Sequence, residues 1–205
     1  MSFPIHFARA LIPAAVLVAP VAAPAAAGDL SQVKAHLKSV SSMTANFVQT
    51  DAKGRSLSGT LQLKRPGRIR FEYGRGVNVL LVADGKRLTF VDYEVGQKSS
   101  WALNKTPLGI LLSSDPDIDR IAKVVPNDDP RVLVVRARDP SRNEYGTLIL
   151  AFIKERSAPG GLRLYGWTAV DAQGKRTMVK LSNQRYNVAV APAAFTYAEP
   201  KKRGR

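Results

Sequence analysis

The sequence contains no cysteine. A disulfide framework and a lipid anchor on an N-terminal cysteine are therefore excluded. Histidine is almost as scarce: the chain has only His6 and His36, so the cysteine and histidine sets that usually hold zinc are not available. We expect His36, near the polar edge of a predicted helix, to have a surface or packing role. A folded domain must then depend on an apolar core, for which 205 residues are enough.

Common catalytic motifs are missing as well. The chain has no G-x-S-x-G, no phosphate loop and no dinucleotide fingerprint. Asp115, Asp117 and Asp119 resemble the start of a calcium loop, but Arg120 and Pro126 stand where such a loop requires glycine and glutamate. We therefore expect a protein that is not an enzyme and that has no metal site and no cofactor.

Acidic residues are few. The chain has 16 Asp and Glu against 31 Lys and Arg, a formal net charge of +15. Such a balance favours acidic partners, which include nucleic acid, anionic membrane surfaces and acidic ligands. Export of the protein from the cytoplasm would disfavour nucleic acid as a partner. The basic cluster at residues 201–205 is interpreted as a solvated chain end.

The only long apolar run lies at the N-terminus. A short n-region, Met1–Arg9, precedes an apolar stretch, Ala10–Val21, and Ala25–Ala27 offers small side chains before Gly28. This order is typical of a cleaved secretory signal peptide. An N-terminal membrane anchor is the alternative, but the run is shorter than a span of about 20 residues and contains two prolines. We predict a signal peptide over residues 1–27 and one domain over residues 28–205.

The exported part opens with a predicted amphipathic helix. Asp29 can cap its first turn, with Gln32 three residues later as in a capping box. Apolar residues at helical spacing form one face: Leu30, Val33, Leu37 and Val40.

Alternating apolar and polar residues then predict about ten short strands. The candidates are residues 45–50, 57–64, 68–73, 77–83, 88–90, 101–103, 131–137, 146–153, 162–170 and 177–182, with a last short one at 195–197. Asp84-Gly85 is a two-residue hairpin signal. Thr106 as N-cap and Pro107 at the first helical position are expected to open a short apolar helix, Leu108–Leu112. Residues 118–125 are expected to form a second short helix or a turn. With no long helices between strands, we expect an antiparallel sheet or barrel.

The pattern does not decide what fills the sheet. A closed barrel with a packed core and a curved, lidded sheet around an apolar cavity are both compatible with it.

Five stretches in chain order resemble one family. They are SSMTANFVQT (41–50), GTLQLKRPGRIRFEY (59–73), VADGK (82–86), TPLGILLS (106–113), and DAQGKRT (171–177) followed by Leu181-Ser182-Asn183 and Phe195. The family is that of the outer-membrane lipoprotein carrier proteins, the LolA-like proteins. The resemblance implies a mostly-β (α+β) fold: an incomplete antiparallel β-barrel that encloses an apolar cavity under a lid of short helices.

The resemblance also implies a role. A periplasmic carrier would accept acylated lipoproteins from an inner-membrane ABC transporter and pass them to an outer-membrane receptor or membrane surface, and we expect it to be a monomer. The expected acyl-binding residues are Phe47, Leu61, Leu63, Ile69, Phe71, Tyr73, Leu81, Leu88, Phe90, Leu108, Leu111 and Leu112. Arg65, in the K-R-P motif, would hold the lid shut as a latch; a solvated turn arginine is the alternative.

Two departures from the family pattern stand out. Phe71 occupies a position where tryptophan is common, and only the basic tail follows Tyr197, where some members have a further strand. One-way transport is therefore not implied. Relatives of this fold carry other lipids, so a carrier or sensor of another amphiphile, such as a glycolipid, is the alternative function.

Overall fold

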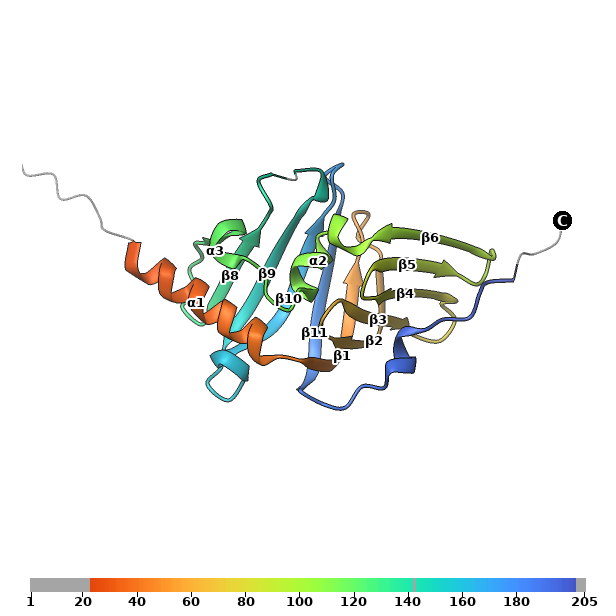
Figure 1. The fold of residues 1–205 in the computed structure, drawn as a ribbon, viewed down its shortest axis with the longest axis horizontal. Helices are drawn as coiled ribbons and strands as arrows, with labels where there is room; N and C mark the ends of the chain where they lie inside the picture. Colours follow the sequence, from red (N-terminus) through yellow and green to blue (C-terminus); the bar gives the residue numbers. More distant parts are fainter. Residues whose placement is uncertain (1–22, 142, 202–205) are drawn as a thin grey trace, which may run out of the picture.

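The computed structural model describes residues 23–141 and 143–201 (Figure 1). Most of the predicted signal peptide, residues 1–22, and the end of the basic tail, residues 202–205, lie outside the described residues. Within the described residues, no helix is both long and apolar enough to cross a membrane.

One antiparallel sheet dominates the molecule. Its eleven strands within the described chain follow the order β6-β5-β4-β3-β2-β1-β11-β10-β9-β8-β7. They are β1 (Ser42–Thr50), β2 (Ser56–Lys64), β3 (Arg68–Tyr73), β4 (Val79–Asp84), β5 (Arg87–Asp92), β6 (Gln97–Ala102), β7 (Ala122–Val125), β8 (Val132–Ala137), β9 (Thr147–Lys154), β10 (Leu162–Val170) and β11 (Arg176–Tyr186). Strands β6 and β7 are the two edges, so the sheet stays open. The expected mostly-β architecture with an unclosed antiparallel sheet is confirmed.

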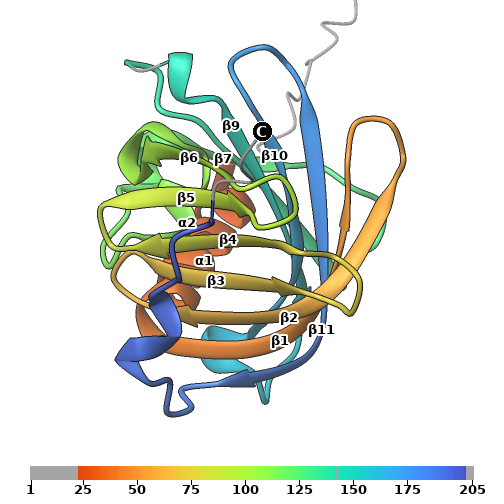
Figure 2. The ribbon, with the colours of Figure 1, turned by 90° about the vertical axis from the view of Figure 1, so that its right-hand side faces the viewer.

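The sheet curves strongly, and its helices lie on the concave side (Figure 2). They are α1 (Ala23–Ser39), α2 (Leu108–Leu112) and α3 (Ile118–Ile121). Short 3-10 turns lie in the connecting segments: η1 (Leu103–Lys105), η2 (Asn143–Tyr145), η3 (Pro159–Gly161) and η4 (Pro192–Phe195), the last of which packs on the outer face. Alternating side chains of the strands and one face of α1 meet in a single large apolar core. Strand alternation and helix periodicity therefore bury the same face.

The start of α1 corrects one prediction. The helix begins at Ala23, so Asp29 is not its cap; Asp29 lies inside the helix and pairs with Lys154 at 3.3 Å. Alanine is the strongest helix former, and the alanines of residues 25–27 extend the helix past the capping signal. The predicted cleavage point before Gly28 accordingly lies within α1.

The segment after β6 differs from the prediction in three details. Leu103 begins η1 and does not extend a strand. Pro107 occupies the cap position of α2, while the Thr106 hydroxyl donates to the Leu103 carbonyl at 2.8 Å. Residues 118–125 divide into the short helix α3 and the edge strand β7, because Ala122–Val125 pairs with β8.

The chain end returns across the outer face of the sheet. The predicted strand at 195–197 is wrong: Phe195 ends η4, and residues 196–201 form no regular structure. Phe195 and Val190 cover the outward side chains Leu80, Val82 and Val91 in a second apolar cluster. Side-chain burial therefore anchors this segment in place of strand pairing.

His36 is buried, which corrects its expected place at the polar edge of the helix. It is 2% exposed, its Nδ1 lies 2.8 Å from the Pro159 carbonyl oxygen, and its ring meets the edge of Phe152. Turn η3 can approach α1 this closely because residue 160 is a glycine at φ 65°. A Cβ at that position would lie 2.6 Å from the backbone nitrogen of His36. Burial lowers the pKa of His36 below its ordinary value.

The buried histidine predicts a loss of stability in mild acid. The unfolded chain takes up the proton near the ordinary pKa of about 6.5, whereas the folded protein resists it. Stability from the neutral ring is complete above that pH and is lost as the pH falls toward the lowered pKa. Urea unfolding at pH 7.5 and pH 5 should show a larger loss for the native protein than for His36→Gln. Equal losses in both proteins would contradict this assignment.

Candidate functional site

The concave face of β1–β5 is built from the residues that alternation predicts to point inward. Cross-strand pairs Leu61–Phe71 and Leu63–Ile69 align them between β2 and β3, and Ala83–Leu88 continues the face between β4 and β5. All of the following are buried: Phe47, Leu61, Leu63, Ile69, Phe71, Tyr73 and Leu88. Apart from the Tyr73 hydroxyl, these side chains offer only hydrocarbon and aromatic surface.

An aromatic cluster ties the two halves of the sheet together. The Phe47 ring meets Phe71 and Tyr73 edge-on, at centroid distances of 5.1 and 5.3 Å, and Phe71 meets Trp167 of β10 at 6.1 Å. Such edge-to-face pairs add about 0.5–1.5 kcal/mol beyond their burial. Gly59 leaves room for them, because a Cβ there would lie 2.9 Å from the Phe47 ring and closer still to the backbone of β3.

Trp167 is a site residue that sequence reasoning missed. Simple alternation from Leu162 and Leu164 would point it outward. A register shift between Leu164 and Gly166 reverses the parity and buries Trp167 opposite Val179. No signal in the sequence distinguishes it from the neighbouring Tyr165, because a bulge leaves no distinct sequence pattern.

Helix α2 covers part of the concave face. Leu108, Leu111 and Leu112 are buried in the same apolar core as the strand residues. The structure therefore brings ten of the twelve expected acyl-binding residues into that core as buried side chains, with α2 packed against the sheet.

Leu81 and Phe90 differ from the others because they are only half-buried. They pair across β4 and β5 on the concave face, and Leu81 packs against the core. Phe90 lies instead in an open cleft of about 450 Å³ beyond the reach of α2. Tyr73, Val77 and Val79 line its apolar wall, and its rim carries Asp51, Arg55 and Lys175. The apolar pattern of Leu108–Leu112 predicts that this helix covers all of the inward strand residues, and that prediction is wrong at Phe90.

Tyr73 supplies a polar group at the inner wall of this cleft. Its hydroxyl donates to Oε1 of Gln49 at 2.9 Å. Burial raises the pKa of Tyr73 to about 12, so the phenol stays neutral at physiological pH. Tyr73 therefore keeps its hydrogen to donate and adds no charge to the cleft.

Arg65 joins the two helices that lie on the concave side. It leaves the turn between β2 and β3, and its Nε and Nη2 donate to the Leu111 carbonyl at 3.1 and 3.0 Å. Its Nη1 donates to the carbonyls of Leu37, at 2.8 Å, and Val40, near the end of α1. Helix ends leave such carbonyls unpaired and carry partial negative charge, which suits a guanidinium. Burial lowers the pKa of Arg65 to about 10, so the group stays charged at neutral pH.

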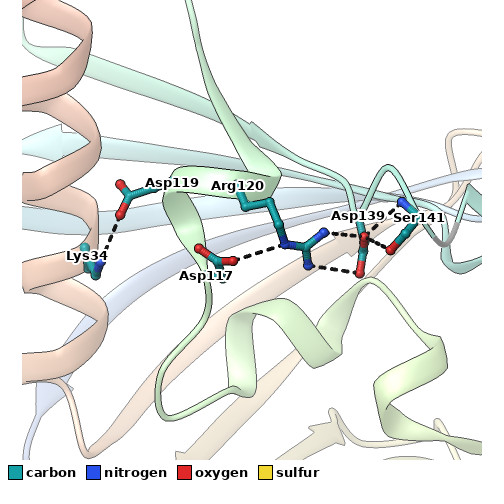
Figure 3. Close-up of polar contacts among 6 residues, drawn as sticks. All are labelled: Lys34, Asp117, Asp119, Arg120, Asp139 and Ser141. Atoms are coloured by element: carbon teal, nitrogen blue, oxygen red, sulfur yellow. Dashed lines mark hydrogen bonds and ion pairs between the residues drawn. The ribbon is translucent and has the colours of Figure 1, made fainter.

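A second set of polar contacts holds α3 (Figure 3). Lys34 of α1 pairs with Asp119 at 2.9 Å. Arg120 pairs with Asp117 at 3.1 Å and with Asp139 at 2.9 Å, which links α3 to the loop after β8. The Arg120 guanidinium and the Ser141 hydroxyl hold the pKa of Asp139 far below its usual range. The aspartates that resemble a calcium loop thus serve as partners for cations.

No metal-binding group of three or more His, Cys, Asp or Glu occurs among the residues that the structure describes. Every buried side-chain nitrogen and oxygen in the same residues has a hydrogen-bond partner. The interior therefore presents no unsatisfied polar atom to a ligand, and the chemistry available on the concave face is apolar contact.

Comparisons with known proteins agree with this geometry. The chain matches the family described as "Outer membrane lipoprotein carrier protein LolA" over residues 38–198. It is 30% identical over 200 residues to an outer-membrane lipoprotein carrier protein of Chromobacterium violaceum, with 93% of each chain covered. An outer-membrane lipoprotein carrier protein of Actinobacillus succinogenes is 29% identical, over 91% of this chain and 90% of the relative.

Among solved structures, a DUF1329 family protein from Desulfovibrio piger is similar in fold, with a TM-score of 0.54 at 9% sequence identity. The match covers 86% of this chain and 99% of that protein. At this identity the likeness concerns the fold alone. The family match spans most of the chain, and the relatives align over nearly their whole length. The chain therefore belongs to the family of outer membrane lipoprotein carrier proteins, LolA.

Proposed function

We propose that this protein is a periplasmic carrier that binds the acyl chains of lipoproteins on its concave face and moves them from the inner to the outer membrane. Membership of the LolA family supports lipoprotein cargo. The observation that carries the proposal is the placement of α2: its leucines rest on an apolar face, while the Leu111 carbonyl accepts two hydrogen bonds from the buried Arg65 guanidinium. Such a helix can cover the face or leave it.

The physical need for such a site is large. Acyl chains transfer from water at about 0.8 kcal/mol for each buried CH₂, so one chain of about 16 carbons contributes roughly 12 kcal/mol. Departure of α2 would expose its leucines together with the strand residues beneath them, and burial of acyl chains offsets that exposure. The cleft at Phe90 supplies a starting point, because it already opens onto the concave face.

Arg65 acts in this proposal as the latch of the empty state. Each hydrogen bond from a charged donor contributes about 1.5–3 kcal/mol, and two such bonds reach Leu111. Acyl chains in the cavity replace α2 and break these bonds, and re-formation of the bonds favours release. The contacts to Leu37 and Val40 keep the guanidinium in place on α1 while α2 moves.

The proposed route defines partners and location. An inner-membrane ABC transporter would load the carrier, and an outer-membrane receptor or the membrane surface would unload it. Residues 1–27 would direct export to the periplasm and be removed there. The carrier would act as a monomer.

A second candidate function is transport or sensing of another amphiphile, such as a glycolipid. Lys175 on the rim of the Phe90 cleft favours it, because its charge would suit an anionic headgroup, whereas Arg55 is already paired with Asp51 at 2.7 Å. Mass spectrometry of material that co-purifies from the periplasm separates the two. We expect acylated lipoproteins; a glycolipid without bound lipoprotein would favour the second function.

Replacing Arg65 with leucine should separate loading from release. The variant keeps apolar bulk but loses all donors to α2. We expect normal or faster acceptance of cargo from the inner membrane and release to the outer membrane slowed about tenfold or more, because loss of the Leu111 bonds removes at least about 1.5 kcal/mol from closure. The two steps are measured separately as transfer of a radiolabelled lipoprotein.

Arg68→Leu is the matched control, since Arg68 leaves the same hairpin and forms no hydrogen bond to α1 or α2 among the described contacts. It should transfer cargo normally. Normal release by Arg65→Leu, or failure of its loading, would rule out the latch.

Replacing Phe90 with glutamate should weaken cargo binding without unfolding the protein. Phe90 is half-buried in the cleft, so a charge there stays hydrated in the empty protein but opposes an acyl chain. The lost burial of a phenylalanine, about 1.5–3 kcal/mol, corresponds to roughly a tenfold to hundredfold weaker affinity. Titration with a fluorescent fatty acid measures it. Val95→Glu, at a position 51% exposed, should bind as the native protein does, and equal binding by both variants would exclude the cleft from the site.

A further inference from the structure

The outer face of β7–β11 is unlike any other surface of the sheet. On β8, Arg136 and Val134 point outward between buried neighbours, and Ile149 and Ala151 do so on β9. Register aligns these side chains into rows across the strands. One row runs through Lys123, Arg136, Ile149, Thr168 and Met178. The helices α1 and α2 lie on the opposite side of the sheet (Figure 1).

Apolar side chains occupy the middle of this face. Tyr165 and Met178 are 40% and 43% exposed, and Val48 on neighbouring β1 is 45% exposed. A shallow groove of about 160 Å³ is lined by Tyr165 and Met178 together with Ile149 and Ala151. The corresponding outer face of β4 and β5 is covered by Val190 and Phe195 of the chain end, whereas no described segment covers this one.

The charge of this face has one sign. Strands β7 to β11 contain no Asp or Glu and seven Lys or Arg. Of these cations, Lys154 lies on the opposite side, where it pairs with Asp29 of α1, and Arg163 pairs with Glu155. Arg176 and Lys180 flank the apolar centre on one side, and Lys123 and Arg136 on the other, and within the described chain these four form no ion pair. The exposed Val48, Tyr165 and Met178 and these four cations together form the apolar-basic face.

Lys123 and Arg136 make the strongest case for an external anion. They lie directly opposite each other in the β7–β8 ladder, where like charges are destabilising. Arg120 and Arg138 line the adjoining cleft of about 440 Å³ together with them. Of these four, only Arg120 has carboxylate partners. Because these cations lie close together and repel one another, an external anion that binds here would stabilise them.

We propose that the apolar-basic face docks the protein on an anionic phospholipid surface. Lipid phosphates would meet the flanking cations, and the exposed Val48, Tyr165 and Met178 would contact the boundary between headgroups and acyl chains. A bilayer fits better than an acidic protein for two reasons. The groove is shallow, and the side chains between the cations offer little directional hydrogen bonding.

The docking geometry leaves the cargo site accessible. Because the apolar-basic face and the concave face lie on opposite sides of one sheet, α2 stays free to move while the outer face rests on lipid (Figure 1). The inference does not depend on which cargo the concave face binds.

Vesicle flotation tests the proposal with the full exported chain. The probes are phosphatidylcholine vesicles and vesicles in which part of the phosphatidylcholine is replaced by phosphatidylglycerol. We expect binding to the anionic vesicles alone, and weaker binding as salt is raised. Each cation near such a surface strengthens binding about fivefold, so Arg136→Glu/Lys180→Glu should bind at least about thirtyfold more weakly. Met178→Ser should lower the binding that remains at high salt.

The matched control is Arg75→Glu/Lys86→Glu, which makes the same change of net charge in turns of the other half of the sheet. It should lose less than about threefold. Thermal unfolding of each variant checks that folding is intact. The proposal is overturned if the native protein does not float with anionic vesicles, or if the control loses as much as the test variant. It is also overturned if cross-linking captures an acidic protein at residue 180 while vesicles are ignored.

Discussion

The guanidinium of Arg65 is the contact on which the covering of the concave face depends. It meets carbonyls from two helices that are far apart in the chain: α1 precedes the sheet, and α2 follows its sixth strand. Arginine suits this place because its pKa, even lowered to about 10, leaves it charged, and because its fork offers several donors at once. Its partners are carbonyls and not carboxylates. The contact is therefore weaker than a buried ion pair would be, and a helix held in this way can detach.

The sheet itself presents three apolar surfaces, each covered in a different way. The concave face is covered by α1, α2 and α3, and the aromatic contact between Phe71 and Trp167 joins its two halves. The outer face of β4 and β5 is covered by the chain end through Val190 and Phe195. The outer face of β9–β11 has no such cover within the described chain, and its surroundings are basic. An open sheet can have its surfaces covered in these different ways because each face packs against its own set of residues.

The distribution of polar groups agrees with a binding protein for apolar cargo. Buried polar side-chain atoms of the described residues already have hydrogen-bond partners within the protein. A ligand on the concave face therefore does not have to supply hydrogen bonds to them. Charged contacts lie at the margins, as in the pairs that hold α3 between α1 and the loop after β8. Exposed pairs of this kind are individually weak. They position α3 and do not involve α2.

The sequence by itself determined the class of the fold and the inward set of strand residues. Period-two alternation at Leu61, Leu63, Ile69 and Phe71 leaves only one face that can be buried, and short turns leave only antiparallel pairing. Family motifs, and not periodicity, pointed to Arg65, because nothing local tells a latch from a solvated turn residue. Tertiary structure decided the rest. It buried His36 under η3, reversed the parity at Trp167 through a bulge, left Phe90 in an open cleft and turned the predicted last strand into a covering segment. Each of these outcomes depends on contacts between residues that are distant in the chain. The free energy of such contacts cannot be predicted from a local sequence pattern.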